Sequence, residues 1–412
     1  MKFERYPISS DIKKNLALMG FIKPTDIQFK AIPSILKGED VLAVAQTGTG
    51  KTAAFVIPII DRIHSAKNSR RAKGIKCIVM VPTRELAMQI GEVFTKLSKH
   101  TKVKTFALYG GVAQDDQIKK LQDGIDVLIA TPGRMFDLIS QKHISLDCIE
   151  ILVIDEADYM LELGFIEDIR YIKRMIRTRH QTLFFSATIS ERIKKLAYSQ
   201  VKNSAIHIQI SPKDPVSKNV SHYVMFVEMD DKRFFLEQFI KDNPKSKIIV
   251  FVRTRVRAQR VAKAMERVGI ASLAIHGDRE QYERTDVMKK FRAGQCNLLV
   301  ATDVSARGIN IADIEYVINY DLPIKTENYV HRVGRTGRGV NKGIAISFCS
   351  KEELELLNEI QGFLNKEIEV IKINKKDYSA VVNPVNYESD WKTLIEKEAE
   401  RIKSKRAKFK NK

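Results

Sequence analysis

The sequence has few of the features that mark exported, membrane-spanning or metal-binding proteins. Its four cysteines are scattered through 412 residues, and no two of them form a C-x-x-C pair. Such spacing favours reduced structural thiols over a disulfide framework or a zinc site. The N-terminus leads into no apolar signal segment, and no apolar run approaches the length that spans a bilayer. We therefore expect a soluble, cytoplasmic protein with no membrane association.

Short internal repeats and low-complexity stretches are also lacking. With 412 residues, of which 44% are hydrophobic, the chain is too long for one ordinary core and is predicted to form two domains. Acidic residues are in the minority, because 50 Asp and Glu face 70 Lys and Arg, a formal charge of +20. This excess favours nucleic acid as a partner and an anionic membrane surface second, although a solvated surface would carry the same charge.

Short apolar strands alternate with amphipathic helical stretches through most of the chain, which predicts parallel α/β domains. The alternation pauses at the polar, proline-bearing residues 211–215, which suit a linker. We predict a first domain at residues 1–205, a linker at 206–220, a second domain at 221–376, and a charged helix with a basic tail at 377–412. Strands are expected at residues 41–45, 77–81, 105–108, 127–130, 151–154, 182–185, 247–251, 272–275, 298–301, 316–319 and 343–348.

The end of the chain differs in composition from the rest. Residues 389–401 suit one charged helix that holds the only tryptophan, and residues 401–412 contain seven basic residues and no acidic one. This end can be a disordered solubilising tail or an electrostatic arm for phosphates, and the two interpretations are compatible.

A glycine-rich stretch, A-Q-T-G-T-G-K-T, connects the first predicted strand to a helix. Its glycines let the backbone approach phosphates, and N–H groups at the helix start can surround them. Lys51 would reach the β- and γ-phosphates, and the Thr52 hydroxyl would bind Mg²⁺. The first position is alanine, where the usual phosphate-loop pattern has glycine. The predicted loop comprises Ala45, Gln46, Thr47, Gly48, Thr49, Gly50, Lys51 and Thr52.

Two carboxylates, Asp155 and Glu156, follow the apolar strand at residues 151–154. They are expected at the carboxyl edge of a buried parallel sheet, where open α/β sheets bind ligands. Asp155 suits Mg²⁺ binding, and Glu156 suits orienting and deprotonating an attacking water. The two acids could instead cap the following helix, but the phosphate loop upstream favours the catalytic interpretation.

Residues 331–338 read H-R-V-G-R-T-G-R and contain arginines spaced three residues apart. The planar guanidinium fork suits the charge that develops on a γ-phosphoryl group during hydrolysis. The wide separation of the three segments predicts a nucleoside triphosphate site shared by two domains.

The chain contains further short segments in a fixed order. They are G-F-I-K-P-T-D-I-Q (20–28), P-T-R-E-L (82–86), G-G (110–111), T-P-G-R (131–134), S-A-T (186–188) and A-T-D-V-S-A-R-G-I (301–309). Together with D-E-A-D (155–158), the set resembles the DEAD-box ATP-dependent RNA helicase family of superfamily 2. The match covers roughly residues 3 to 350, and the short flanks and basic tail are similar to its bacterial RhlE-type branch. The resemblance implies two tandem RecA-like parallel-sheet domains with a short basic C-terminal tail.

For the nucleotide, the resemblance implies ATP with Mg²⁺. Gln28 would read the adenine edge, and Thr25 would support the phosphate loop. Phe3 would stack on the base, although it could equally anchor the N-terminal segment in the core. The family usually has an aspartate that contacts the ribose at position 310, where this chain has Asn310 after Gly308. The implied catalytic residues are Lys51, Asp155, Glu156, Arg335 and Arg338, with Thr52 and Asp155 on the metal.

For RNA, the resemblance implies contacts to phosphate and sugar that do not read sequence. The implied residues are Pro82, Thr83, Arg84, Gly111, Thr131, Gly133, Arg134, Arg253, Thr254, Gly277, Gln281, Arg284, Thr302 and Asp303. Asp158, Ser186, Thr188 and His331 would couple the two domains.

The predicted function is an ATP-dependent RNA helicase that unwinds short duplexes locally or remodels RNA–protein complexes. We expect a monomer, with ribosomal or mRNA-decay proteins as candidate partners. Two alternatives stay open: an RNA clamp that uses ATP but unwinds little, and a DNA helicase or translocase of the same superfamily.

Overall fold

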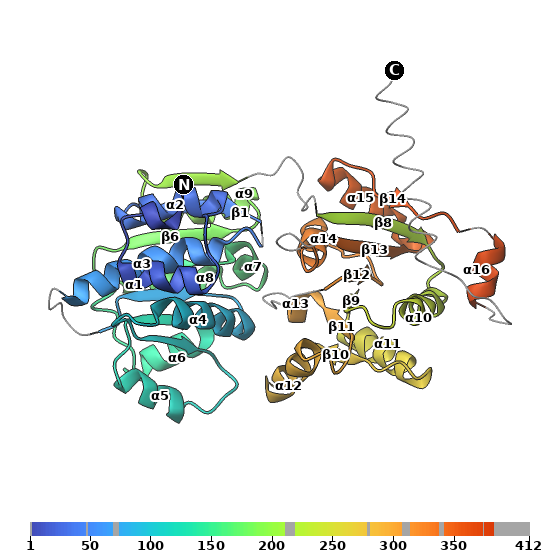
Figure 1. Ribbon diagram of the computed structural model, residues 1–412, viewed down its shortest axis with the longest axis horizontal. Coiled ribbons are helices and arrows are strands. Elements are labelled where there is room, and N and C mark those ends of the chain that lie inside the picture. The colour runs from blue at the N-terminus through green and yellow to red at the C-terminus, as the bar shows by residue number, and fades with distance from the viewer. Residues whose placement is uncertain are drawn as a thin grey trace, which may run out of the picture. The chain divides into compact units, whose positions relative to one another are not determined.

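The chain divides into two compact units, Met1–Lys213 and Asp214–Lys412. Each unit has its own sheet and its own helices (Figure 1). The structure is a computed structural model. It describes residues 2–46, 48–68, 74–210, 219–277, 281–306, 314–337, 342–373 and 375–382.

The first unit contains seven parallel strands in the order β3-β4-β2-β5-β6-β1-β7. They are β1 (Val41–Ala45), β2 (Cys77–Met80), β3 (Thr105–Leu108), β4 (Val127–Ala130), β5 (Ile151–Ile154), β6 (Gln181–Ser186) and β7 (Ile206–Ile210). One face packs against α1 (Ser10–Leu18), α2 (Asp26–Leu36), α3 (Lys51–Asn68) and α4 (Arg84–Ser98). The other face packs against α6 (Pro132–Ser140), α7 (Ala157–Glu162), α8 (Ile166–Met175) and α9 (Glu191–Gln200), and α5 (Asp115–Gln122) lies between β3 and β4 in the chain.

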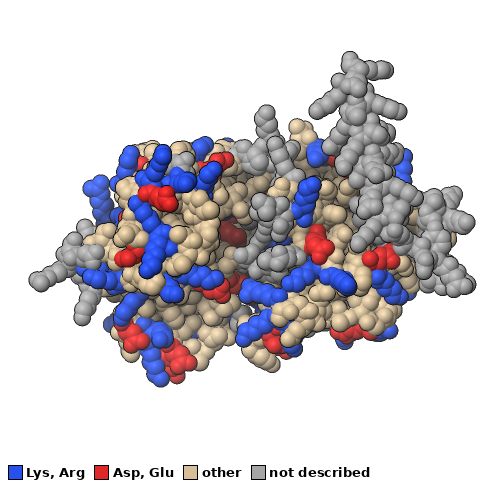
Figure 2. All heavy atoms as spheres, in the orientation of Figure 1, with Lys and Arg blue, Asp and Glu red and all other residues tan. Residues whose placement is uncertain are grey.

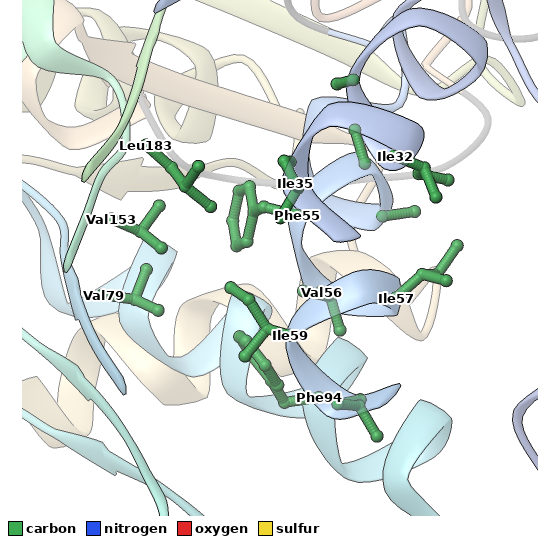
Figure 3. Close-up of a cluster of buried hydrophobic side chains, with 14 of the residues drawn as sticks. Ile32, Ile35, Phe55, Val56, Ile57, Ile59, Val79, Phe94, Val153 and Leu183 are labelled. Carbon is green, nitrogen blue, oxygen red and sulfur yellow. The ribbon is translucent and has the colours of Figure 1, made fainter. Parts of the chain in front are cut away.

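The central strands are apolar on both faces because helices cover both. Figure 3 shows the α3 side of this core, where Phe55 points towards the strand residues Val153 and Leu183. The ring centroid of Phe55 lies 5.1 Å from that of Phe185 on β6 and 6.4 Å from that of Phe94 on α4. This packing fixes the helix that begins at the phosphate loop against the sheet.

The second unit also contains seven parallel strands, in the order β10-β11-β9-β12-β13-β8-β14. They are β8 (Val220–Phe226), β9 (Ile248–Val252), β10 (Leu273–Ile275), β11 (Leu298–Thr302), β12 (Tyr316–Asn319), β13 (Gly343–Cys349) and β14 (Glu369–Val370). Its longer helices are α10 (Lys232–Asp242), α11 (Arg255–Arg267), α12 (Gln281–Arg292), α14 (Thr326–Val333), α15 (Leu354–Leu364) and α16 (Lys375–Val382). Short helical segments are η1 (Phe3–Arg5) in the first unit, and α13 (Asp303–Ala306) and η2 (Lys351–Glu353) in the second.

The two sheets repeat one strand order, since every strand number in the second exceeds its counterpart in the first by seven. A residue that follows a strand in one unit therefore has a topological counterpart in the other. Thr83 begins α4 after β2, and Thr254 begins α11 after the counterpart strand β9. Thr131 after β4 corresponds in the same way to Thr302 at the end of β11. The RNA residues predicted in the two halves thus lie at equivalent sheet positions.

The predicted fold class, two RecA-like parallel-sheet domains, is confirmed. The predicted linker at 206–220 differs from the structure at both ends. Residues Ile206–Ile210 form β7, which pairs with β1, and β8 begins at Val220 and pairs with β13. Hydrogen bonding to an existing sheet makes strands of segments that a composition change had marked as linker, and residues 211–218 lie outside the described ranges.

The predicted boundary between residues 376 and 377 passes through α16, which belongs to the second unit. The ring of Tyr378 lies 5.0 Å from Phe235 on α10. Its hydroxyl accepts the N–H of Glu228 at 2.9 Å and donates to Asp231 at 2.7 Å. The predicted helix at 389–401 and the basic tail fall outside the described residues. No helix in the described ranges is both long and apolar enough to cross a membrane.

Candidate nucleotide and nucleic-acid site

The predicted phosphate loop lies between the carboxyl end of β1 and the start of α3. Lys51 is 7% exposed, and its ammonium donates to the carbonyl of Ala45. The hydroxyl of Thr49 donates to the carbonyl of Gln46 at 2.7 Å, which closes the turn. Gly48 is exposed, Thr52 is half-buried in the first turn of α3, and Thr47 is outside the described residues.

Gln28 lies directly against this loop. Its amide nitrogen donates to the carbonyl of Gly50 at 3.1 Å, and its amide oxygen accepts the N–H of Thr25 at 3.0 Å. The second bond belongs to a capping box that begins α2. Gly50 has a φ of +92°, and a β-carbon there would collide with the Gln28 side chain. The residue predicted to read the base is therefore fixed between a helix start and the phosphate loop.

Phe3 lies in the core of the first unit. Its side chain is buried, with ring centroids 5.8 Å from Tyr6 and 6.4 Å from Phe21, and its N–H donates to the carbonyl of Ile22. A ring covered in this way has little face left for stacking on a base. The structure thus supports the core anchor, and the base contact stays a prediction.

Asp155 and Glu156 follow β5 as the sequence predicts. Glu156 adopts a left-handed backbone with φ of 50°, and its N–H donates to the Asp155 carboxylate at 2.9 Å. Asp155 is 3% exposed. Burial raises the pKa of Asp155 to about 7, the ammonium of Lys51 opposes that shift, and the Glu156 carboxylate adds to it.

These groups fit a Mg²⁺ ion. Mg²⁺ prefers oxygen ligands, and the two predicted ligands supply a hydroxyl from Thr52 and a carboxylate from Asp155. The neighbouring carboxylates of Glu156 and Asp158 both raise the pKa of Asp155. A divalent cation would offset this concentration of buried negative charge, and it would polarise phosphate oxygens.

Asp158 joins the acidic strand end to β6. Its carboxylate accepts the N–H and the hydroxyl of Thr188, at 3.0 and 3.1 Å. Ser186, which is buried, donates to the carbonyl of Thr188 at 2.7 Å. Three of the four residues predicted to couple the domains therefore form one cluster within the first unit. The fourth, His331, is a buried residue of α14 in the second unit.

The predicted RNA residues of the first unit follow β2, β3 and β4, and contacts with neighbouring residues hold several of them in place. The hydroxyl of Thr83 accepts the N–H of Leu86 and caps α4. Gly111 approaches the guanidinium of Arg84 so closely that a β-carbon would collide with it. Arg134 donates to the amide of Gln117 at 2.6 Å and to the carbonyl of Val112 at 3.0 Å. Pro82 is buried, Thr131 is half-buried and Gly133 is exposed.

Those of the second unit lie after β9, β10 and β11. The hydroxyl of Thr254 accepts the N–H of Arg257 at 3.2 Å and caps α11. The hydroxyl of Thr302 is buried and donates to Ser305 at 3.1 Å. Gly277 is exposed and Arg284 is half-buried on α12, whereas the side chain of Gln281 is not described.

Asp303 faces the interior of the second unit. Its carboxylate binds Arg332 through two hydrogen bonds of 2.5 and 2.9 Å. Arg332 is buried and also donates to Asn319 at 3.3 Å and to the carbonyl of Asp321 at 2.6 Å. This arginine was not among the predicted site residues, although the spacing of arginines in H-R-V-G-R included it. The arrangement makes Asp303 a link between α13 and α14.

Arg335, a predicted finger, is buried two residues after the end of α14, and its Nε donates to the carbonyl of His331 at 3.0 Å. The turn after it needs glycine. Gly337 has a φ of +65°, and a β-carbon there would collide with Val220. Packing against Val220 thus requires glycine at position 337, whatever its role at the nucleotide. Arg338, Gly308 and Asn310 lie outside the described residues.

The fold and the site define a class: tandem RecA-like domains, of which the first carries a phosphate loop beside an acidic strand end. The chain matches the DEAD/DEAH box helicase family over residues 25–196 and the helicase conserved C-terminal domain over residues 231–340. It belongs to the DEAD/DEAH box helicase family.

Curated relatives agree with this assignment. The chain is similar to the ATP-dependent RNA helicase RhlB of Shewanella oneidensis, with 39% identity over 373 residues, 90% of this chain and 85% of that protein. It is similar to the ATP-dependent RNA helicase DeaD of Buchnera aphidicola, with 40% identity over 92% of this chain and 62% of that protein. These relatives carry RhlB and DeaD names, so the RhlE-type branch stays a prediction.

Solved structures give the same result. S. cerevisiae Dbp5 bound to RNA and ADP BeF3 matches with a TM-score of 0.82 and 30% identity, over 92% of this chain and 97% of that one. Mss116p bound to ssRNA and AMP-PNP matches with a TM-score of 0.82 and 28% identity, over 94% of this chain and 82% of that one.

Proposed function

We propose that this protein is an ATP-dependent RNA helicase that binds the RNA backbone without reading sequence and unwinds short duplexes locally. The observation that carries the proposal is the placement of three groups: Lys51 is buried at the phosphate loop after β1, and Asp155 is buried beside Glu156 at the end of β5. One sheet edge thus holds a phosphate-binding cation and two carboxylates, which is the chemistry that triphosphate hydrolysis needs.

In this function Lys51 binds the β- and γ-phosphates, and Thr52 and Asp155 hold Mg²⁺. Glu156 orients the attacking water and accepts its proton. The left-handed backbone at Glu156 turns the chain sharply after β5, so consecutive carboxylates can serve these two roles. Arg335 and Arg338 stabilise the charge on the γ-phosphoryl group, and an arginine finger of this kind is worth about 10³–10⁵ in rate.

RNA is bound by residues at equivalent edges of the two sheets. Thr83 and Thr254 are counterparts, and so are Gly111 after β3 and Gly277 after β10. Hydroxyl groups, exposed backbone N–H groups and guanidinium groups bind phosphate and sugar without discriminating bases. If ATP and RNA favour the same arrangement of the domains, each tightens the binding of the other by the same factor.

The proposal extends to the cellular setting. RhlB and DeaD are named as RNA helicases of bacteria, and we propose a cytoplasmic monomer that acts on cellular RNA. Ribosomal or mRNA-decay proteins are the candidate partners.

The test is Glu156→Gln, which keeps the shape of the side chain and removes its basicity. We expect RNA-stimulated ATP hydrolysis to fall about 10²-fold or more while ATP-dependent RNA binding stays intact. Glu162→Gln, at the end of α7, is the matched control and should retain the wild-type rate. An unchanged rate in Glu156→Gln would contradict the assignment of the base.

Separate assays distinguish the alternatives for the wild-type protein. Displacement of a strand from a short RNA duplex supports a helicase, and RNA-stimulated hydrolysis without displacement indicates an RNA clamp. Equal stimulation by single-stranded DNA and RNA would indicate a DNA-directed enzyme instead.

A further inference from the structure

A buried carboxylate outside every predicted motif organises the edge of the second unit. Glu353 ends η2 after β13 and is 1% exposed. It accepts hydrogen bonds from the ammonium of Lys232, the guanidinium of Arg253 and the backbone N–H groups of Leu322 and Ser350. Donors from four separate segments therefore converge on one side chain.

Lys232 is the partner that explains why a carboxylate can be buried here. It begins α10, is 0% exposed, and also donates to the carbonyl of Tyr320 at 2.8 Å. Burial alone would raise the pKa of Glu353, but Lys232 and Arg253 outweigh it and hold that pKa below its ordinary value. Glu353 is therefore a carboxylate at neutral pH, whereas burial lowers the pKa of Lys232 and Glu353 opposes that shift. Removing one partner would leave an uncompensated buried charge.

Arg253 is the residue that this pair fixes. Its N–H donates to the Asp321 carboxylate at 3.0 Å, and its guanidinium donates to Glu353. Asp321 also pairs with Arg257 at 3.1 Å, and its carbonyl accepts Arg332. Arg253 is thus held at both its backbone and its side chain. Its side chain is 31% exposed, so it still reaches the surface at the edge where RNA is predicted to bind.

Lys232 occupies the position in the second unit that Lys51 occupies in the first. Lys51 begins the first helix after β1, and Lys232 begins the first helix after the counterpart strand β8. In the first unit this lysine faces the phosphate loop of the nucleotide site. In the second unit the anion beside it is Glu353, a carboxylate of the chain itself.

We propose that Glu353 and Lys232 are a positioning pair that orients the guanidinium of Arg253 towards an RNA phosphate. The inference rests on the proposed helicase function and adds two residues that none of the predicted motifs contains. Lys232 neutralises Glu353, and Glu353 then restricts Arg253 to one orientation. Arginine restricted in this way loses less conformational entropy when it binds a phosphate.

The test uses the full chain and a double variant that leaves no unpaired buried charge. Lys232→Met combined with Glu353→Gln removes both charges together, and Glu352→Gln, an exposed neighbour, is the matched control. Binding of a labelled single-stranded RNA is measured by fluorescence anisotropy at several salt concentrations. ATP hydrolysis is measured against RNA concentration, and thermal unfolding confirms that each variant is folded.

We expect the double variant to bind RNA about tenfold more weakly, the loss typical of one charge-assisted contact. The slope of log affinity against log salt should become shallower by about 0.7, one phosphate contact on a single strand. The turnover rate at saturating RNA should stay within about twofold, because the pair touches neither nucleotide nor metal. Glu352→Gln should match wild type in all three.

Arg253→Ala decides whether the pair acts through this arginine. Added to Arg253→Ala, the Lys232→Met and Glu353→Gln substitutions should weaken RNA binding no further. A multiplicative loss, or wild-type RNA affinity and salt slope in the folded double variant, would overturn the positioning role while leaving the helicase assignment intact. A wild-type protein that hydrolysed ATP without any response to RNA would overturn the proposed function and this inference with it.

Discussion

Asp155 is a buried carboxylic acid of the first unit whose pKa is raised strongly. Its carboxyl group has an ordinary pKa of 3.8, and burial raises that pKa to about 7 in the folded protein. Between these values the folded state holds the proton more tightly than the unfolded state. The contribution to stability is therefore complete below pH 4 and is lost as the pH rises through about 7.

This shift predicts proton release when a magnesium nucleotide binds, because a metal ligand must be deprotonated. At about pH 6 the affinity for Mg²⁺·ADP should rise with pH and level off above about 7. Calorimetry in two buffers of different ionisation enthalpy measures the released proton directly. Asp155→Asn should remove the release, and identical binding heats in the two buffers for wild type would contradict the raised pKa.

Sequence patterns at this scale identified residues but not their partners. Asp155, Glu156 and Lys51 were predicted together because each follows a recognisable strand or loop. Asp303 was predicted as an RNA contact, but its partner Arg332 is 29 positions away along the chain. Glu353 lies 100 positions from Arg253. Contacts across such distances depend on the sheet order, which local patterns do not contain.

At the scale of the element, the phosphate loop and α2 act as one unit through the contact of Gly50 with Gln28. Gly48 and Gly50 both have positive φ, 84° and 92°, but only Gly50 is crowded. Gly48→Ala should cost about 1 kcal/mol of stability from backbone strain alone. Gly50→Ala should cost about 1–3 kcal/mol more, because Gln28 must move. Thermal unfolding and ATP affinity measure both effects, and equal losses in the two variants would refute the steric argument.

The helix α16 is predicted to stabilise the second unit through one hydroxyl. Tyr378→Phe removes the hydrogen bonds to Glu228 and Asp231 while keeping the ring against Phe235. We expect a loss of about 1–2 kcal/mol in the free energy of unfolding, measured by denaturant titration. Tyr282→Phe, at a side chain that is 75% exposed, is the control and should change little.

Element prediction succeeded for most strands, including the edge strands β3 and β10, and failed beside the predicted linker and at a very short strand. The eleven predicted strands match β1 to β6 and β9 to β13 within a residue or so at each end. The three that were missed are β7, β8 and β14. β7 reads I-H-I-Q-I, and its alternation was a usable signal, but the neighbouring proline-bearing stretch outweighed it. β14 has two residues, too few to carry any periodicity.

At the scale of the whole molecule, the excess of positive charge lies on the surface. Figure 2 shows Lys and Arg side chains over more of the visible face than Asp and Glu. With a formal charge of +20, the protein should bind RNA with a strong dependence on salt. The fold class could be predicted from the sequence because parallel sheets leave a regular alternation of apolar strands and amphipathic helices. The order of the motifs is read directly from the sequence.

Deleting residues 401–412 tests the contribution of the basic tail. The deletion removes seven positive charges and no negative ones. RNA affinity should fall and its salt dependence should flatten, while basal ATP hydrolysis stays unchanged. Binding titrations at two salt concentrations measure this, with a variant in which the seven basic residues are replaced by serine as the control for length. Equal affinity before and after deletion would leave the tail with a solubilising role.

The repeated strand order has a consequence for stoichiometry. In the proposed function the helix-opening lysine of the first unit, Lys51, binds an exchangeable phosphate, whereas the corresponding lysine of the second unit pairs with Glu353 of the same chain. Within the described residues, the duplicated scaffold thus keeps this lysine position for a triphosphate in the first unit and fills it with a carboxylate of the chain in the second. Each chain would then hydrolyse one nucleotide per cycle. The second unit would respond to that hydrolysis without hydrolysing a nucleotide of its own.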